Sequence, residues 1–338
     1  MRSALRPGIA VVASWLAIGS PPVGLTAAPQ GGQTSIAAAG GLEVLELRPN
    51  FFMIAGAGAN IGVQIGDDGV VVVDTGSSAS AGNVLVAIQK LSPRPIRYII
   101  DTSADPDHVG GNETLSKAGQ TLFTIPGSIG LPGNFLGGVA SILSAEKVLS
   151  RMSAPTGETS PFPAGAWPTE TFDHARKYMF LNDEGIEILH QPAAHTDGDA
   201  IVFFRRSDVV VAGDILDTTR FPVIDVPRGG SIEGEIAALN KIVDLAIPSV
   251  PIVSREAGTI VIPGHGRLCD QLDVVEYRDM VSIIRDRVRD LMDAGMALDQ
   301  IKSAAPARGY TRRYGSDTGP WTTDMFIEAI FNTLSRKQ

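Results

Sequence analysis

Cysteine is nearly absent from this sequence, with Cys269 the only one among 338 residues. An intrachain disulfide is therefore excluded, and the fold must depend on a hydrophobic core, a bound metal, or both. We expect Cys269 to be buried.

Basic clusters are missing too, since no run of five or more lysines and arginines occurs and the formal net charge is −9. Because phosphate contacts need clustered basic side chains, nucleic acid is not an expected partner.

Long apolar runs are scarce, and the clearest one lies near the N-terminus. Arg2 and Arg6 precede an apolar stretch over about 9–18, and small residues follow it. This order is typical of a secretory signal peptide, which we predict over 1–28, with an uncleaved N-terminal anchor as the alternative. The stretch is too short to span a bilayer comfortably. We expect a periplasmic or secreted protein without membrane contact after cleavage, and a flexible leader over 29–40.

The rest of the chain alternates between strand-like and helical patterns. Residues 42–76 contain short apolar runs separated by turns, which predict four consecutive antiparallel strands. Further strands are predicted at 96–102, 121–125, 184–192, 200–214 (a hairpin turning at "RRSD") and 259–266. Helical spacing is found at 80–91, 113–118, 145–152, 231–246, 274–294, 297–304 and 322–335. This order favours a layered architecture with sheets in the middle.

Polar residues that bind metals gather where predicted strands end. Three of the five histidines follow a strand-like run and stand beside glycine or small polar residues, in "DPDHVGG", "PAAHTDGD" and "IPGHG". Neutral imidazoles and carboxylates are the ligands that divalent metals prefer. The candidate metal ligands are Asp105, Asp107, His108, His195, Asp214 and His265.

Each of these residues also has a structural interpretation. Asp105 and Asp107 could cap the helix expected after Gly111, and a single buried histidine is more often structural than a ligand. Three histidines at three strand ends favour a shared metal site. His174 and His190 lack the glycine-rich context, and we expect them to serve packing or to lie on the surface.

Four segments, in this order, resemble the metallo-β-lactamase superfamily, which includes glyoxalase II-like thioesterases, lactonases and β-lactamases. They are "VVVVDTG", "TSADPDHVGGN", "HTDGD" with "AGD", and "IPGHG". The resemblance covers residues 42–270 and implies an α+β fold, a four-layer αββα sandwich with two metal positions at the edge between its sheets. We therefore predict a catalytic domain over 41–270 and a C-terminal helical extension over 271–338.

The family's central motif, His-x-His-x-Asp-His, falls on Ser103, Asp105, Asp107 and His108. The resemblance implies a complete second metal position made by Asp107, His108 and His265, with Asp214 as the bridging carboxylate. The first position keeps His195 and Asp214, and Asp105 replaces one histidine with an oxygen ligand. Ser103 is a poor ligand unless it is ionised. We expect one or two zinc ions, with iron or manganese as the harder alternatives.

The resemblance implies a hydrolase that attacks a small molecule with metal-activated water. Asp107 is the expected catalytic residue, since it would bind the metal and orient the nucleophile or take its proton. The expected substrate is a carbonyl ester or amide of the β-lactam, lactone or thioester class. The alternatives are an iron-dependent oxygenase or oxidoreductase and a degenerate, non-catalytic binding protein. The glycine-rich segment 126–143 is a lid or substrate wall, or else a packing loop or partner surface; the sequence identifies neither substrate-binding residues nor the oligomeric state.

Overall fold

A computed structural model describes residues 35–37, 39–122, 138–154, 158–250 and 258–335. All of them belong to the unit that begins at Gln33. The predicted signal peptide, the first part of the leader, residues 123–125 of the expected strand 121–125 and residues 126–137 lie outside the described residues, so these assignments stay predictions. Residues 121 and 122 are described and lie outside any strand. The end of the 126–143 segment is not a loop as expected, because its last three residues begin a strand at Ser141–Ala145. Within the described ranges, no helix has both the length and the apolar character that a membrane span requires.

The first sheet begins with antiparallel strands and continues with parallel ones. Strands β1 to β5 pair antiparallel with their neighbours, which confirms the four antiparallel strands expected over 42–76. Strands β5 to β8 then pair in parallel. The strands of this sheet are β1 (Ser35–Ala37), β2 (Glu43–Arg48), β3 (Phe51–Ala55), β4 (Ile61–Gly66), β5 (Gly69–Val73), β6 (Ile96–Ile100), β7 (Ser141–Ala145) and β8 (Glu170–Phe172).

The second sheet has the order β13-β12-β11-β10-β9. Its strands are β9 (Arg176–Leu181), β10 (Glu184–Gln191), β11 (Asp199–Phe204), β12 (Val209–Val211) and β13 (Ile260–Ile262). The hairpin predicted at "RRSD" is confirmed, since β11 and β12 pair antiparallel across that turn. Strand β9 is not expected from the sequence, because its exposed positions carry Tyr178 and Phe180 and so hide the alternation of polar and apolar residues.

The predicted helices are confirmed in the described residues, with small shifts at their ends. The α-helices are α1 (Ala81–Leu91), α2 (Pro106–Val109), α3 (Asn112–Ala118), α4 (Glu146–Met152), α5 (Ile232–Leu245), α6 (Gln271–Asp293), α7 (Leu298–Ser303), α8 (Thr311–Tyr314) and α9 (Thr323–Ser335). Short 3-10 turns are η1 (Ala39–Gly41), η3 (Ala164–Ala166), η4 (Gly213–Ile215) and η5 (Val226–Arg228). Helix α6 begins three residues earlier than expected because Asp270 and Asp273 form a capping box, each carboxylate accepting the other residue's backbone N–H.

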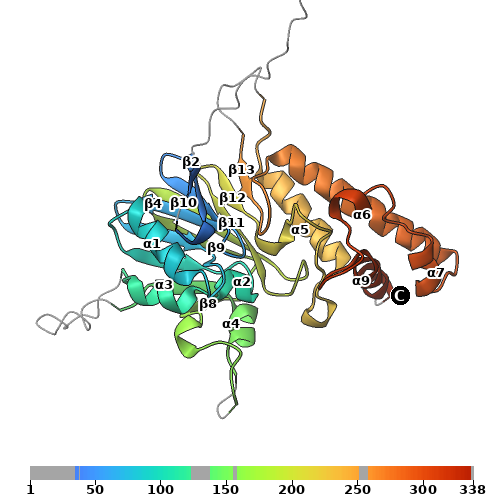
Figure 1. Ribbon diagram of the computed structural model, residues 1–338, viewed down its shortest axis with the longest axis horizontal. Helices are drawn as coiled ribbons and strands as arrows, with labels where there is room; N and C mark the ends of the chain where they lie inside the picture. Colours follow the sequence, from blue (N-terminus) through green and yellow to red (C-terminus); the bar gives the residue numbers. More distant parts are fainter. Residues whose placement is uncertain (1–34, 38, 123–137, 155–157, 251–257, 336–338) are drawn as a thin grey trace, which may run out of the picture. The chain divides into compact units, whose positions relative to one another are not determined.

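Alternating side chains divide the sheets into layers. Val70 and Val72 pack with residues of α1 and α3, whereas Val71 and Val73 pack against the inner face of the second sheet. A third apolar cluster joins the outer face of the second sheet to α5, α6 and α9. Figure 1 shows α1 and α3 on one side of the sheets and α5, α6 and α9 on the other. The four-layer αββα sandwich with C-terminal helices, predicted from the sequence, is therefore confirmed.

Candidate metal centre

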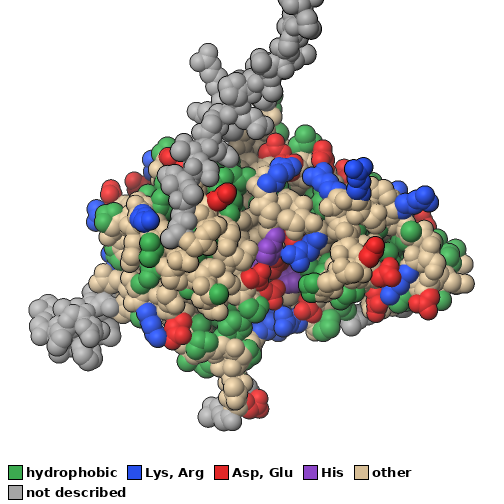
Figure 2. Space-filling model, in the orientation of Figure 1, with side chains coloured by type: hydrophobic (Ala, Val, Ile, Leu, Met, Phe, Trp, Pro, Cys, Tyr) green, Lys and Arg blue, Asp and Glu red, His purple; other side chains and the backbone are tan. Residues whose placement is uncertain are grey.

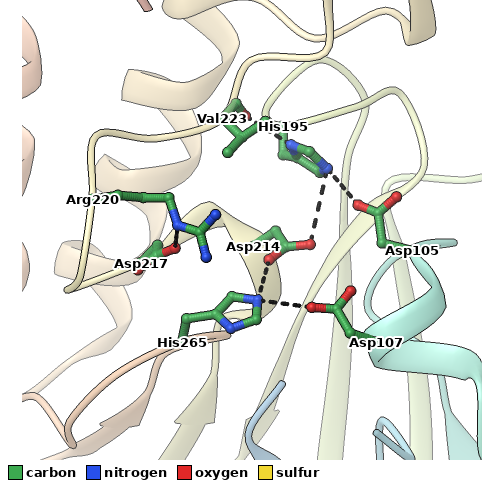
Figure 3. Close-up of a pocket in the computed structure, with 8 residues that line it drawn as sticks. All are labelled: Asp105, Asp107, His195, Asp214, Asp217, Arg220, Val223 and His265. Atoms are coloured by element: carbon green, nitrogen blue, oxygen red, sulfur yellow. Dashed lines mark hydrogen bonds and ion pairs between the residues drawn. The ribbon is translucent and has the colours of Figure 1, made fainter. Parts of the chain in front are cut away.

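The six predicted ligands converge at one edge of the sandwich, where loops leave the two sheets. Helix α2 follows β6, His195 lies in the loop between β10 and β11, η4 follows β12, and His265 follows β13. A cavity of about 150 Å³ opens between them. Its lining residues are Asp105, Asp107, His195, Asp214, Asp217, Arg220, Val223 and His265. Figure 2 shows histidine side chains among acidic and basic ones in a hollow of this face, and Figure 3 shows the lining residues.

One group of ligand atoms is formed by Asp105, His195 and Asp214. The His195 Nε2 atom lies 2.7 Å from Asp105 Oδ2 and 3.9 Å from Asp214 Oδ2. The three ligand atoms of this group lie within 4.8 Å of one another. This is the arrangement of the first metal position that the resemblance implied, with an aspartate in place of a histidine.

The second group is formed by Asp107, His108 and His265, and its ligand atoms also lie within 4.8 Å of one another. His265 Nε2 lies 3.3 Å from both Asp107 Oδ2 and Asp214 Oδ1. His108 Nε2 lies 3.1 Å from the same Oδ1 atom of Asp214. Asp214 therefore stands between the two groups and turns one carboxylate oxygen toward each (Figure 3).

Hydrogen bonds fix the orientation of two imidazoles. The Nδ1 atom of His195 lies 2.7 Å from the carbonyl oxygen of Val223, which only accepts, so Nδ1 donates. The Nδ1 atom of His108 donates in the same way to Asp74 Oδ2, at 2.8 Å. Both rings thereby turn Nε2 toward Asp214. Buried His108 Nε2 lies 3.1 Å from Asp214 Oδ1, but this contact lacks hydrogen-bond geometry, and no other described residue offers Nε2 a hydrogen bond. This fits a ligand atom that a metal would satisfy.

The mixture of nitrogen and oxygen atoms suits a divalent ion such as zinc, iron or manganese. Burial opposes a proton on His265, but contacts with Asp107 and Asp214 raise the pKa of His265 to about 9. Burial likewise opposes charging His108 and His195, yet neighbouring carboxylates raise the pKa of both well above the usual range. Burial also opposes the charge on Asp214, but the histidines hold its pKa well below its usual range. A metal entering this site must therefore displace protons from the imidazoles.

Asp74 is a functional residue that the sequence did not single out. It directly follows the apolar strand β5, has a positive φ of 61°, and is fully buried. Its carboxylate accepts hydrogen bonds from the backbone N–H and hydroxyl of Thr102, at 2.8 and 2.7 Å, as well as from His108. A charged residue directly after a run of four valines was the available signal, because a buried carboxylate needs hydrogen-bond donors.

The loop that carries His195 is closed by Asp199 of the "HTDGD" segment. Both oxygens of this buried carboxylate accept bonds from Thr196, one from the backbone N–H and one from the hydroxyl, each at 2.7 Å. Burial raises the pKa of Asp199 to about 6. The turn therefore holds His195 in the loop just before β11 without placing Asp199 in the cavity.

The helix expected after Gly111 is α3, whose N-cap is Gly111 itself and which has no side-chain capping bond, so neither Asp105 nor Asp107 caps it. Asp105 stands at the N-cap of α2, yet its side chain makes no capping hydrogen bond and contacts His195 instead. The buried Ser103 hydroxyl accepts from the Asp105 backbone N–H, at 3.2 Å, and belongs to neither ligand group. Ser103 thus shapes the turn before α2, as expected of a poor ligand.

The remaining histidines and the cysteine lie away from the cavity. The His174 side chain is exposed, and His190 Nε2 contacts a backbone carbonyl at 2.8 Å. Cys269 is buried, and burial raises the pKa of its thiol to about 12. These three positions agree with the structural roles predicted for them.

Two arginines that contact residues of the cavity wall were also not predicted. Arg220 lines the cavity, with Nε 2.7 Å from Asp217 Oδ2, and Figure 3 shows its guanidinium on the side of Asp214 and His265. Arg228 contacts Asp105 at 3.2 Å. Neither arginine belongs to a motif. Both follow Asp214 in the sequence, at positions separated from it by segments without regular strands or long helices, so no local pattern marks them.

Comparisons with known proteins agree with this geometry. The chain is 22% identical over 275 residues to a linear primary-alkylsulfatase from Pseudomonas sp., a match that covers 72% of this chain and 50% of that protein. The stereoselective inverting sec-alkylsulfatase Pisa1 from Pseudomonas sp. superposes with a TM-score of 0.57 at 15% identity, over 86% of this chain and 49% of the other. DIM-1 metallo-β-lactamase superposes with a TM-score of 0.50 at 17% identity, over 71% of this chain and 97% of the other.

The chain spans about half the length of the alkylsulfatases that it matches. At these identities the solved structures show a shared fold. The model of the metallo-β-lactamase superfamily matches residues 55–249, which is more than half of the chain and carries five of the six predicted ligands. The chain therefore belongs to the metallo-β-lactamase superfamily, whose members are generally metal-dependent hydrolases.

Proposed function

We propose that this protein is a hydrolase that holds one or two divalent ions, zinc first, and cleaves a small ester or amide. The observation that carries this proposal is the position of Asp214, which lies between two groups of imidazole and carboxylate ligand atoms at the wall of one cavity. A divalent ion bound there would activate water and polarise the bond to be cleaved. Iron and manganese are the alternative metals.

The chain's own residues would supply the remaining chemistry. Asp107 has one oxygen near His265 and a side chain that is 41% exposed at the cavity, so its carboxylate is accessible to a substrate and its nucleophile. The hydrogen bond from His265 is the main cause that lowers the pKa of Asp107, which keeps Asp107 ionised. We assign Asp107 as the residue that orients the nucleophile or accepts its proton.

The first candidate substrates are compact carbonyl compounds of the β-lactam, lactone and thioester classes. A cavity of about 150 Å³ admits only the reacting group, so the rest of such a substrate would extend outside. The superfamily membership supports this class.

Alkyl sulfate esters are the second candidate, and Arg220 favours them. Arg220 is the only lysine or arginine among the residues that line the cavity, and its terminal nitrogens have no hydrogen-bond partner in the described part of the chain. A guanidinium fork matches the oxygens of a sulfate group. The alkylsulfatase relatives support the same substrate class.

A substrate panel with and without metal tests both classes. Protein stripped by a chelator and then restored with zinc is assayed against a β-lactam, a lactone, a thioester and a primary alkyl sulfate. We expect hydrolysis of at least one compound, lost on stripping and regained with zinc. Asp107→Asn should lower kcat by about 10²- to 10⁴-fold, whereas the same change at the exposed Asp67 should have no effect.

The Arg220→Gln variant separates the two substrate classes. If sulfate esters are the substrates, this variant should raise KM for the alkyl sulfate and leave a neutral lactone unaffected. Equal effects on both would remove the argument for sulfate. Oxygen consumption by iron-loaded protein without hydrolysis would favour the oxygenase alternative, and failure to retain any metal would favour a binding protein.

We also propose that the protein acts outside the cytoplasm, as a periplasmic or secreted enzyme. The pattern of residues 1–28 supports this proposal. N-terminal sequencing of the exported protein should find a new N-terminus near residue 29, and recovery of the full chain from the cytoplasm would contradict export.

A further inference from the structure

Arg228 lies against Asp105, the residue that stands where the family's motif has its second histidine. The Nη1 atom of Arg228 is 3.2 Å from Asp105 Oδ1, while Asp105 Oδ2 is 2.7 Å from His195 Nε2. One oxygen of the carboxylate thus faces the first metal position, and the other faces a guanidinium.

The backbone that carries Arg228 is fixed, although its side chain is half-exposed. The Asp225 carboxylate accepts from the Arg228 backbone N–H at 3.0 Å and lies 3.5 Å from its Nε. The Arg228 carbonyl accepts from Arg151 at 2.7 Å. Five residues earlier, the Val223 carbonyl receives the bond from His195. The segment 223–228 therefore positions both His195 and Arg228.

We propose that Arg228 balances the charge that Asp105 brings to the first metal position. A histidine ligand would be neutral, whereas Asp105 adds a negative charge. The guanidinium, which stays protonated, offsets that charge and donates a hydrogen bond to Oδ1. Only Oδ2 then remains free to serve as a metal ligand. The pair thus offers an ion one oxygen atom without added net charge, as a neutral imidazole would offer one nitrogen. This inference rests on the proposed metal-dependent function.

Zinc titrations in competition with a chromophoric chelator test the inference directly. We expect two binding steps in the unchanged protein, and His195→Ala should remove the step that belongs to the first position. Arg228→Gln should tighten that step by about tenfold, which corresponds to about 1.4 kcal/mol, and should leave the other step unchanged. Arg228→Lys keeps the charge and should bind close to the unchanged protein.

A matched control is Arg278→Gln, because Arg278 pairs with Asp279 and Asn240 on α6 and α5, away from the cavity. This variant loses the same charge, and its two zinc steps should stay unchanged. If Arg278→Gln tightened zinc binding as much as Arg228→Gln, the effect would be one of overall charge and the inference would fail.

The Asp105→Asn variant separates charge balance from a structural role. It leaves the cation of Arg228 beside the site without a carboxylate, so zinc binding at the first position should weaken. Adding Arg228→Gln to Asp105→Asn should restore part of the loss.

Unchanged or weaker binding in Arg228→Gln, or weaker binding in the double variant than in Asp105→Asn, would overturn the inference. In either case one or two zinc steps in the unchanged protein would leave the proposed function intact. A single step that His195→Ala does not change would show that the first position holds no zinc, and this too would overturn the inference. Absence of both steps from the unchanged protein would instead overturn the proposed function itself.

Discussion

Replacing Asp74 with asparagine is expected to weaken zinc binding at the second position by about 10- to 100-fold, or about 1.4 to 2.7 kcal/mol. Both carboxylate oxygens of Asp74 are occupied as acceptors, by Thr102 and by His108 Nδ1 at 2.8 Å. An asparagine has one acceptor oxygen and one NH₂ group that only donates. Whichever way the side chain turns, this NH₂ group faces either the Thr102 N–H or the two donors at Oδ2, one of which is His108 Nδ1. Either clash disturbs the buried contact that orients His108.

Competition titration with zinc measures this effect, and asparagine tolerates the positive φ of position 74. Asp183→Asn is the matched control, because Asp183 has a similar φ of 55° but an exposed side chain. Zinc affinity of Asp74→Asn within twofold of the unchanged protein would refute the role of Asp74. Thermal unfolding of the metal-free variant shows whether the fold is retained.

Three further predictions concern the second metal position and the core. His265→Ala should remove one bound zinc per chain, as measured by elemental analysis, and undiminished metal would contradict the assignment. Because the pKa of His265 is raised from 6.5 to about 9, its proton stabilises the metal-free protein below pH 6.5 and this stabilisation is lost as the pH rises through 9; melting of His265→Ala should lack that part of the pH dependence. Zinc affinity should rise over the same range, since zinc displaces the proton. The Phe204 side chain is fully buried, and its ring centroid lies 4.7 Å from that of Phe51. Phe204→Ala should therefore lower the free energy of unfolding by about 3–5 kcal/mol. A decrease below about 1 kcal/mol in urea denaturation would contradict its place between the sheets.

Much of the fold could be predicted because short patterns of apolar and polar residues mark the strands and helices that form its layers. The run Val70–Val73 is wholly apolar, and each valine contacts one or the other side of the first sheet. Strand β9 could not be predicted, because Tyr178 and Phe180 are apolar residues on an exposed edge strand. There, position in the sheet decides exposure, and a local pattern does not encode that position.

The candidate site could be predicted in part, for a related reason. The glycine-flanked histidines His108, His195 and His265 are recognisable in short segments, and the fold brings them together. Arg228 could not be predicted, since its contact with Asp105 spans 123 positions and depends on the path of an irregular loop. Asp74 stood within a recognised segment, but its hydrogen bond to His108 follows only from the geometry of β5 and α2.

The number of zinc ions bound per chain tests the central claim most directly. Equilibrium dialysis of the purified protein, followed by elemental analysis, should find two zinc ions per chain at saturation. His195→Ala and His265→Ala should each retain one. An unchanged protein that binds no zinc, iron or manganese after dialysis would contradict the metal site and the hydrolase built on it.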